Sequence, residues 1–220
     1  MIKYIKYIKY IKYNLSICMF ICSVFMSNAQ GSADAKQLMD GWIQLVQSRG
    51  ISAKFTAKSF EGKNLISQDI SGDIVMKGNQ LYFDTEELSL WFNGTTQWVY
   101  FKNTREVNIT TPTADELAQT NPMVAISEYP SKFTLQLINQ ADVHHYTIKM
   151  TPKNKQENFE KLIVKFNKKD NMLQSIKLQE KTPTTHEFIV TKYQQDASIH
   201  GKMFIFDASK FEGAILNDLR

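Results

Sequence analysis

The amino-acid sequence predicts a mainly β fold with a few helices. Short apolar stretches that alternate with polar residues follow one another from residue 51 to residue 110, and they resume after Tyr129-Pro130. Glycine, asparagine and aspartate gather between these stretches, as in the turns of an antiparallel meander. About eleven such strands curl into a barrel or a strongly curved sheet.

A helix is expected before the first strand. Ser32 suits an N-cap, and Gly50 is a typical helix end. Between them, six apolar residues recur at helical spacing, which predicts packing against a sheet or a place in a cavity wall. These residues are Leu38, Met39, Trp42, Ile43, Leu45 and Val46.

The expected strands fall into two groups. Asn93-Gly94 is a strong signal for a hairpin turn in the first group. The first group covers residues 51–60, 65–76, 81–85, 88–92, 95–101 and 106–110. The second covers residues 133–138, 145–151, 162–166, 172–179, 187–193 and 202–206.

Two short helices are expected between these groups. Thr113 and Glu116 have the spacing of a capping box, which predicts a helix from Ala114 to Gln119. Asn121-Pro122 then breaks the chain before a second helical piece at 123–126. These pieces interrupt a chain that otherwise consists of strands.

The hairpin around Asn93-Gly94 is apolar on both faces. Leu90 and Phe92 oppose Trp91 on one strand, and Trp98 and Tyr100 oppose Val99 and Phe101 on the other. In a sheet with one solvent-exposed face, apolar and polar residues alternate more regularly along each strand. Either ordinary core packing, with the helices at 114–126 as the cover, or a bound ligand therefore accounts for the second face.

Residues 1–29 have the pattern of a cleaved secretory signal. Four lysines precede a twelve-residue apolar run from Leu15 to Met26, and Ser27-Asn28-Ala29 has the small residues that cleavage requires. A bilayer span needs about 18 residues or more, which disfavours a permanent anchor. Cys18 and Cys22 follow large isoleucines, which disfavours lipidation. We expect a single domain over residues 30–220.

The mature chain offers little for catalysis. It has no cysteine, its four histidines lack metal-ligand spacing, and phosphate-binding glycine loops are absent. Without the leader lysines its net charge falls from +4 to zero, which disfavours nucleic acid as a partner. We expect no enzyme activity, no metal and no cofactor.

The order of several motifs resembles the periplasmic outer-membrane lipoprotein carriers, the lipoprotein-localisation chaperones. No single motif decides the resemblance, but the order and spacing are similar over most of the mature chain. The motifs are Ile51–Thr56, Gly72–Lys77, Asn93–Tyr100, Asn121–Met123, Tyr146–Lys153 and Lys202–Phe206.

The resemblance implies an incomplete antiparallel β-barrel whose apolar concave face is covered by short lid helices. It implies a periplasmic carrier that takes acylated lipoproteins from an inner-membrane lipoprotein-releasing ABC transporter to an outer-membrane acceptor. We expect such a carrier to be a monomer. A binding module for another lipid or glycolipid and a periplasmic lipoprotein sensor are the alternative functions.

The resemblance also guides the expected site, because it marks the Trp98-Tyr100 face of the hairpin. Carriers of this family typically have an arginine after the Lys77 position that binds the lid. This chain has Gly78 there, which leaves open whether Lys77 replaces it. The expected cavity residues are Ile74, Met76, Tyr82, Leu90, Phe92, Trp98 and Tyr100, and the expected lid residues are Met123, Val124 and Ile126.

Overall fold

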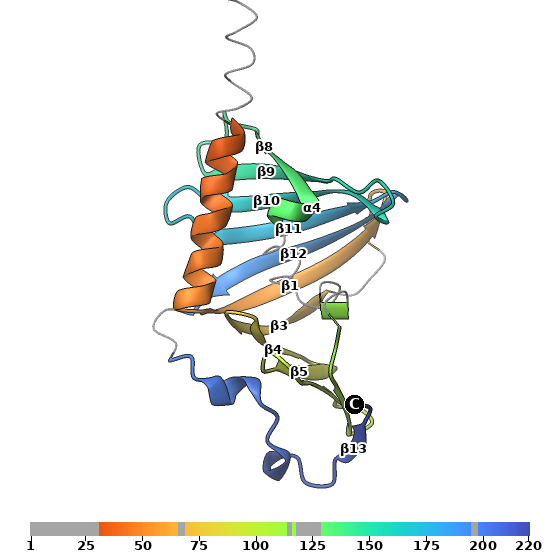
Figure 1. The fold of residues 1–220 in the computed structure, drawn as a ribbon. Helices are drawn as coiled ribbons and strands as arrows, with labels where there is room; N and C mark the ends of the chain where they lie inside the picture. The colour runs from red at the N-terminus through yellow and green to blue at the C-terminus, as the bar shows by residue number, and fades with distance from the viewer. Residues whose placement is uncertain (1–30, 66–68, 114–115, 118–128, 195–197) are drawn as a thin grey trace, which may run out of the picture.

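A computed structural model describes residues 31–220 except 66–68, 114–115, 118–128 and 195–197. These residues form one large sheet with few helices, which confirms the predicted fold class (Figure 1). The strands are β1 (Ile51–Glu61), β2 (Asn64–Leu65), β3 (Ile70–Lys77), β4 (Gln80–Thr85), β5 (Leu88–Phe92), β6 (Gln97–Phe101), β7 (Glu106–Thr110), β8 (Phe133–Ile138), β9 (His145–Pro152), β10 (Phe159–Asn167), β11 (Leu173–Glu180), β12 (Thr184–Tyr193) and β13 (Ile215–Asp218).

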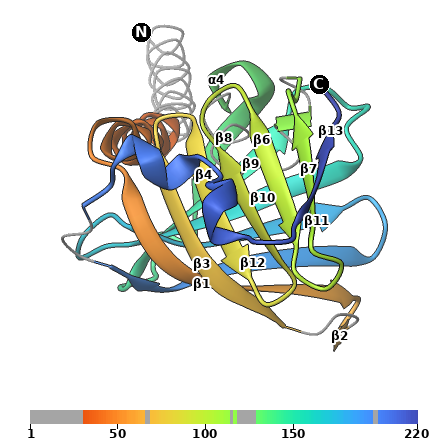
Figure 2. The ribbon, with the colours of Figure 1, turned by 90° about the horizontal axis from the view of Figure 1, so that it is seen from below.

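The sheet is open. Its strand order is β13-β7-β6-β5-β4-β3-β1-β12-β11-β10-β9-β8, and β2 pairs with β1 beside this path. The strands along the path pair antiparallel except β13, which runs parallel to β7. The strands β8 and β13 at the two ends of this order are not paired with each other among the described residues. The sheet is therefore an incomplete barrel, strongly curved as Figure 2 shows.

The sheet consists of two meanders joined by β1. The first runs from β3 to β7 and the second from β8 to β12. Strand β1 lies between them, paired with β3 on one side and with β12 on the other. The register between β1 and β12 shifts at Lys54 and Phe55, which is the signature of a β-bulge.

The helix at residues 31–48 packs one face against the sheet. Ala35, Met39, Trp42 and Val46 are buried, and their spacing places them on one side of the helix. Gly50 ends the helix as expected, with a φ of 78° and its N–H 3.1 Å from the Val46 carbonyl. The expected N-cap at Ser32 is wrong, because the chain is already helical at residue 31. A glycine in a helix costs only about 1 kcal/mol relative to alanine, so Gly31 can adopt a helical conformation.

The capping box at Thr113 is confirmed. The Glu116 carboxylate accepts from the Thr113 N–H at 2.7 Å, and the Thr113 hydroxyl oxygen accepts from the Glu116 N–H at 3.3 Å. Glu116 and Leu117 are helical. The rest of the expected helices at 114–119 and 123–126 lies outside the described residues.

Several segments differ from expectation. The expected strand at 65–76 is interrupted, because Asp69 is not in a strand and β3 begins at Ile70. Helix α4 (Tyr129–Lys132) precedes β8, where the strands were expected to resume directly, and β13 was not foreseen. The expected strand at 202–206 is wrong, because most of it lies in the 3-10 helix η1 (Gly201–Phe204). This segment has no free strand edge to join, since β4 and β5 beneath it are already paired on both sides. Its alternating pattern instead buries Phe204 and Phe206 against the sheet.

Candidate functional site

The sheet has an inner face and an outer face, and the strand register shows which residues lie on each. Ala53, Ile74, Phe83, Leu90 and Val99 lie side by side across β1 and β3 to β6 and define the inner face. Side chains alternate along a strand, so their sequence neighbours point the other way. The outer face is the side that carries Val75, Tyr82, Trp91 and Trp98.

Three stacked aromatic rings lie on the inner face where the two meanders meet. Phe55 of β1 stacks on Phe83 of β4 at 4.8 Å and on Phe188 of β12 at 4.9 Å between ring centroids. Gly72 of β3 permits this close packing. A Cβ atom at Gly72 would lie 1.9 Å from the Asp84 carbonyl oxygen and 3.1 Å from the Phe55 ring.

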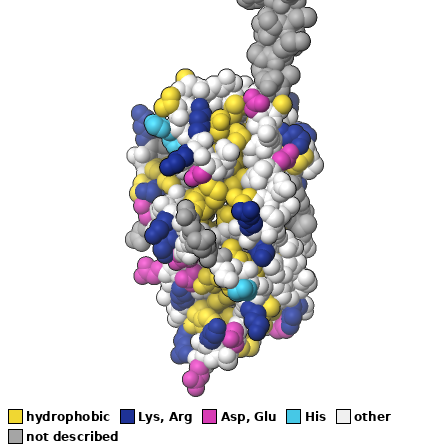
Figure 3. All heavy atoms as spheres, turned by 90° about the vertical axis from the view of Figure 1, so that its left-hand side faces the viewer, with side chains coloured by type: hydrophobic (Ala, Val, Ile, Leu, Met, Phe, Trp, Pro, Cys, Tyr) yellow, Lys and Arg dark blue, Asp and Glu magenta, His cyan; other side chains and the backbone are white. Residues whose placement is uncertain are grey.

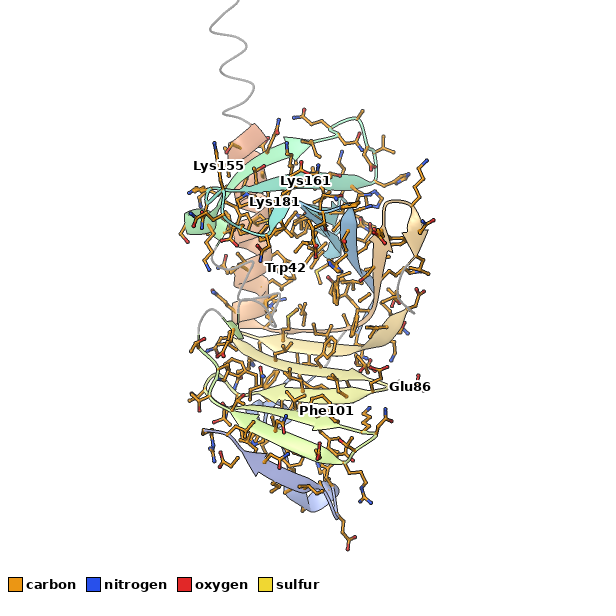
Figure 4. All side chains as sticks on the ribbon, turned by 90° about the vertical axis from the view of Figure 1, so that its right-hand side faces the viewer. Trp42, Glu86, Phe101, Lys155, Lys161 and Lys181 are labelled. Atoms are coloured by element: carbon orange, nitrogen blue, oxygen red, sulfur yellow. The ribbon has the colours of Figure 1, made fainter. Side chains whose placement is uncertain are left out.

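Some side chains of the inner face are fully buried, and others are only half-buried. Phe55, Ile74 and Met76 are almost completely covered, whereas six other apolar side chains of the inner face remain partly exposed. Figure 4 shows the interior between the two meanders, with Trp42 of the helix beside it. Apolar surface of this kind suits an apolar ligand. The half-buried residues are Phe83, Leu90, Ile176, Leu178, Phe188 and Val190.

Trp42 places one polar atom within the apolar core. Its side chain is 3% exposed and meets Phe166 edge to face at 6.3 Å. Its indole nitrogen has no hydrogen-bond acceptor among the described residues. The nearby Tyr193 hydroxyl donates instead to the Leu173 carbonyl at 2.6 Å. Burial raises the pKa of Tyr193.

The structure divides the seven expected cavity residues between the two faces. Ile74, Met76, Leu90 and Phe92 lie on the inner face, and of these only Leu90 is half-buried rather than buried. Leu90 pairs with Val99, so Trp98 and Tyr100 point to the outer face, as Tyr82 does. The seven therefore do not line one cavity. The expected lid residues, Met123, Val124 and Ile126, lie outside the described residues.

Sequence reasoning missed the contribution of the second meander to the inner face. Phe188 and Val190 of β12 and Ile176 and Leu178 of β11 lie on the same side as Phe83. Their alternation with polar residues was visible in the sequence. The signal that they face Phe83 was not, because it depends on the pairing of β1 with β12.

The C-terminal segment, residues 198–214, covers the outer face of the first meander (Figure 2), and β13 follows it at the edge of the sheet. Phe211 contacts the rings of Trp91 at 5.6 Å and Tyr100 at 4.8 Å, and Phe206 contacts Trp91 at 5.3 Å. The expected cover, the helices at 114–126, lies almost wholly outside the described residues. Among the described residues, this segment covers the outer side.

Lys77 does not serve the inner face. It lies on the outer side of β3, and its Nζ reaches the Ile199 carbonyl at 3.4 Å. Gly78 adopts a φ of 60° in the turn between β3 and β4, a conformation that disfavours an arginine, and its N–H donates to the Val46 carbonyl. The position of the family's arginine is therefore used here to join the turn to the end of the helix.

The described residues show no group of three or more His, Cys, Asp and Glu side chains that could hold a metal ion. Two histidines bind nearby carboxylates instead. His186 bonds to Glu180 at 2.8 Å, and His145 bonds to Asp142 at 3.1 Å. No helix in the described part of the chain combines the length and hydropathy needed to cross a bilayer.

An open, curved sheet with an apolar inner face is the architecture of a module that binds apolar ligands. The chain belongs to the family described as outer membrane lipoprotein carrier protein LolA, whose family model matches residues 24–182. No curated protein matches the chain by sequence.

Solved structures are similar to the chain at low sequence identity. An uncharacterized conserved protein from Thermus thermophilus is 8% identical, with a TM-score of 0.54 over 84% of this chain and 99% of that one. A LolA superfamily protein from Nitrosomonas europaea is 10% identical, with a TM-score of 0.44 over 79% and 98%. A putative outer membrane lipoprotein-sorting protein domain from Vibrio parahaemolyticus is 6% identical, with a TM-score of 0.44 over 79% and 97%.

Proposed function

We propose that this chain is a periplasmic carrier that shields the acyl chains of lipoproteins on its inner face. In this proposal it receives lipoproteins from an inner-membrane lipoprotein-releasing ABC transporter and delivers them to an outer-membrane acceptor. The proposal needs no enzyme activity and no cofactor. The periplasmic location in this proposal rests on the predicted secretory leader at residues 1–29.

The observation that carries the proposal is the half-buried apolar lining of the inner face. Phe83 and Leu90 come from the first meander, and Ile176 and Phe188 come from the second. A ligand between them would contact both meanders and the helix. Burial of one methylene contributes about 0.8 kcal/mol, so a chain of roughly twelve methylenes gains about 10 kcal/mol.

Partial exposure also suits release. A fully buried core would have to unfold before it could admit a ligand, whereas half-buried side chains can exchange contacts with one another for contacts with an acyl chain. The net affinity is then the difference between two similar sets of apolar contacts. A carrier needs such a moderate affinity, because it must give up its cargo.

Leu90→Glu tests this proposal directly. A carboxylate on the inner face is costly to bury beside an acyl chain, so the variant should bind a fluorescent fatty acid at least tenfold more weakly. Leu65→Glu makes the same change at a leucine that is 53% exposed on β2, and it should bind like the parent. Equal affinity for the fatty acid in the parent, Leu90→Glu and Leu65→Glu would contradict the proposal.

The identity of the cargo separates the alternatives. The mature chain is isolated from the periplasm and its bound material is identified by mass spectrometry. Acylated protein that passes to outer-membrane vesicles supports the carrier. A free lipid or glycolipid as the sole cargo, or a lipoprotein that is held and never transferred, overturns it in favour of a lipid-binding module or a sensor.

A further inference from the structure

An apolar recess lies on the outer face, on the side of the sheet opposite the proposed acyl site. It is a cleft of about 690 Å³ between β4, β5 and the C-terminal segment, and we call it the outer cleft. Tyr82, Trp91, Phe206 and Phe211 form its aromatic wall, and Met203 and Ile205 form its lip. The cleft depends on residues 202–211, which lie beyond the part of the chain that the family model matches.

The wall of the outer cleft is built from interlocked rings. Trp91 meets Phe206 at 5.3 Å and Phe211 at 5.6 Å, and these two phenylalanines meet each other at 4.9 Å. Tyr82 packs beside Trp91 at 5.6 Å. Each ring is thus held by at least one other ring, so the recess exists before any ligand arrives.

The C-terminal segment is fixed on both sides of the cleft. The Asp207 side chain caps the 3-10 helix η2 (Ala208–Lys210) by accepting from the Ser209 N–H at 3.2 Å. Beyond η2, the Arg105 guanidinium donates to the Glu212 carbonyl, and β13 pairs with β7. A preformed recess of a few hundred Å³ is the usual form of a small-ligand site.

The lip of the cleft is apolar and exposed. Met203 is 37% exposed and Ile205 is 47% exposed, although both face a recess lined by aromatic rings. In Figure 3, hydrophobic side chains gather in the lower part of the molecule, with Lys and Arg side chains beside them. An apolar chain laid along this lip would cover surface that now faces water.

The charge at the rim of the cleft is positive. Lys202 and Lys210 line it with a single acid, Asp207. The carboxylate of Asp207 pairs with the ammonium of Lys210 at 3.7 Å. The ammonium of Lys202 has no ion-pair partner among the described residues. Two further acids near Tyr82 do not alter this balance, because Lys54 pairs with Asp73 and Lys102 pairs with Asp84.

We propose that the outer cleft binds an amphiphile with one apolar chain and a single anionic head group. The chain lies along Met203 and Ile205 against the ring of Trp91, and the head group meets Lys202. This site is separate from the inner face, since the sheet itself lies between them. One molecule of this carrier would therefore hold a small lipid anion and its main cargo at the same time.

The tryptophans allow both faces to be followed in one experiment. Trp42 reports on the inner face and Trp91 on the outer cleft. Decanoate is titrated into the isotopically labelled mature chain at pH 7.5, and the two indole N–H signals are followed by NMR after assignment with single Trp→Phe variants. Both signals should shift, with independent affinities.

Charge variants decide whether the outer cleft binds as proposed. Lys202→Glu should weaken the response of Trp91 to decanoate about tenfold and leave the response of Trp42 unchanged. It should not affect binding of uncharged 1-decanol. Lys165→Glu makes the same change at an exposed outer-face lysine of β10 and should change neither response.

Three results would overturn the proposal. Trp91 could fail to respond to decanoate, Lys202→Glu could leave its response unchanged, or the Trp91 response could vanish in Leu90→Glu. The last result would place all binding on the inner face. Conversely, a Trp91 response without any Trp42 response supports the outer cleft and counts against the proposed function alone.

Discussion

The Tyr129 hydroxyl donates a hydrogen bond to the Asp40 carboxylate, joining helix α4 to the helix at residues 31–48. Tyr129 is 3% exposed, and burial raises the pKa of its hydroxyl. Burial also raises the pKa of Asp40, but the hydrogen bonds from Lys36 and Tyr129 outweigh it, so this pKa lies below its ordinary value. The bond fixes the chain immediately before β8 to the inner side of the sheet.

Tyr129→Phe should lower the free energy of unfolding by about 1 kcal/mol, the usual contribution of one hydrogen bond. The ring still fills its site, so the loss measures the bond alone. Urea denaturation at pH 7 provides the measurement. Tyr100→Phe is the control, because its hydroxyl has no hydrogen bond in the described part of the chain, and it should unfold like the parent.

Asp142→Asn should make the free energy of unfolding depend less on pH in the acidic range. The N–H of His144 and the ring of His145 hold the pKa of Asp142 at about 2. A lowered carboxyl pKa stabilises the fold above the unfolded value of about 4, and this contribution is lost as the pH falls toward 2. Urea denaturation between pH 5 and pH 2 should therefore show a shallower decline for the variant. An identical pH profile would contradict the assigned role.

Gly72→Ala should destabilise the protein by about 3 kcal/mol, because its Cβ atom would collide with the backbone of β4. The collision is with a carbonyl oxygen, which cannot move without separating two strands. Gly41→Ala is the matched control. Nothing lies within 4 Å of its Cβ position, and it is helical, so it should stabilise the protein by up to about 1 kcal/mol.

Phe211→Ala should loosen the C-terminal segment and leave the inner face intact. The change removes the contacts of this ring with Trp91, Tyr100 and Phe206. Hydrogen exchange should rise over residues 201–214 and remain unchanged over β9 and β10. Met203→Ala alters a lip residue that is 37% exposed, and its exchange should match the parent. Uniformly faster exchange in Phe211→Ala would mean that the segment is part of the global core.

Most strands were predictable because each depends on local alternation and turns. The turn at Asn93-Gly94 and the ranges of β5, β7 and β8 match expectation, since the hairpins of a meander are short-range structures. The 3-10 helix η1 was not predictable in this way. The alternation of Met203, Phe204, Ile205 and Phe206 is the same whether the segment pairs in a sheet or lies across one.

The candidate site was harder to predict than the fold. The sequence pattern correctly predicted that the hairpin has apolar side chains on both faces. These side chains include Leu90, Trp91, Trp98 and Tyr100. Which face points inward depends on the curvature of the whole sheet and on Phe211, which lies more than a hundred residues farther along the chain. Local patterns contain no information on either.

The seam between β1 and β12 joins strands that lie far apart in the sequence. Ser59 and His186, which bond across it, are 127 residues apart in the chain. Each meander can form early from local hairpins, whereas the seam closes a long loop and so should form late and slowly. Until it closes, β1 and β12 present unpaired edges, which invite strand exchange with a second molecule. The chain should therefore be most vulnerable to aggregation after its two meanders have formed and before this seam closes.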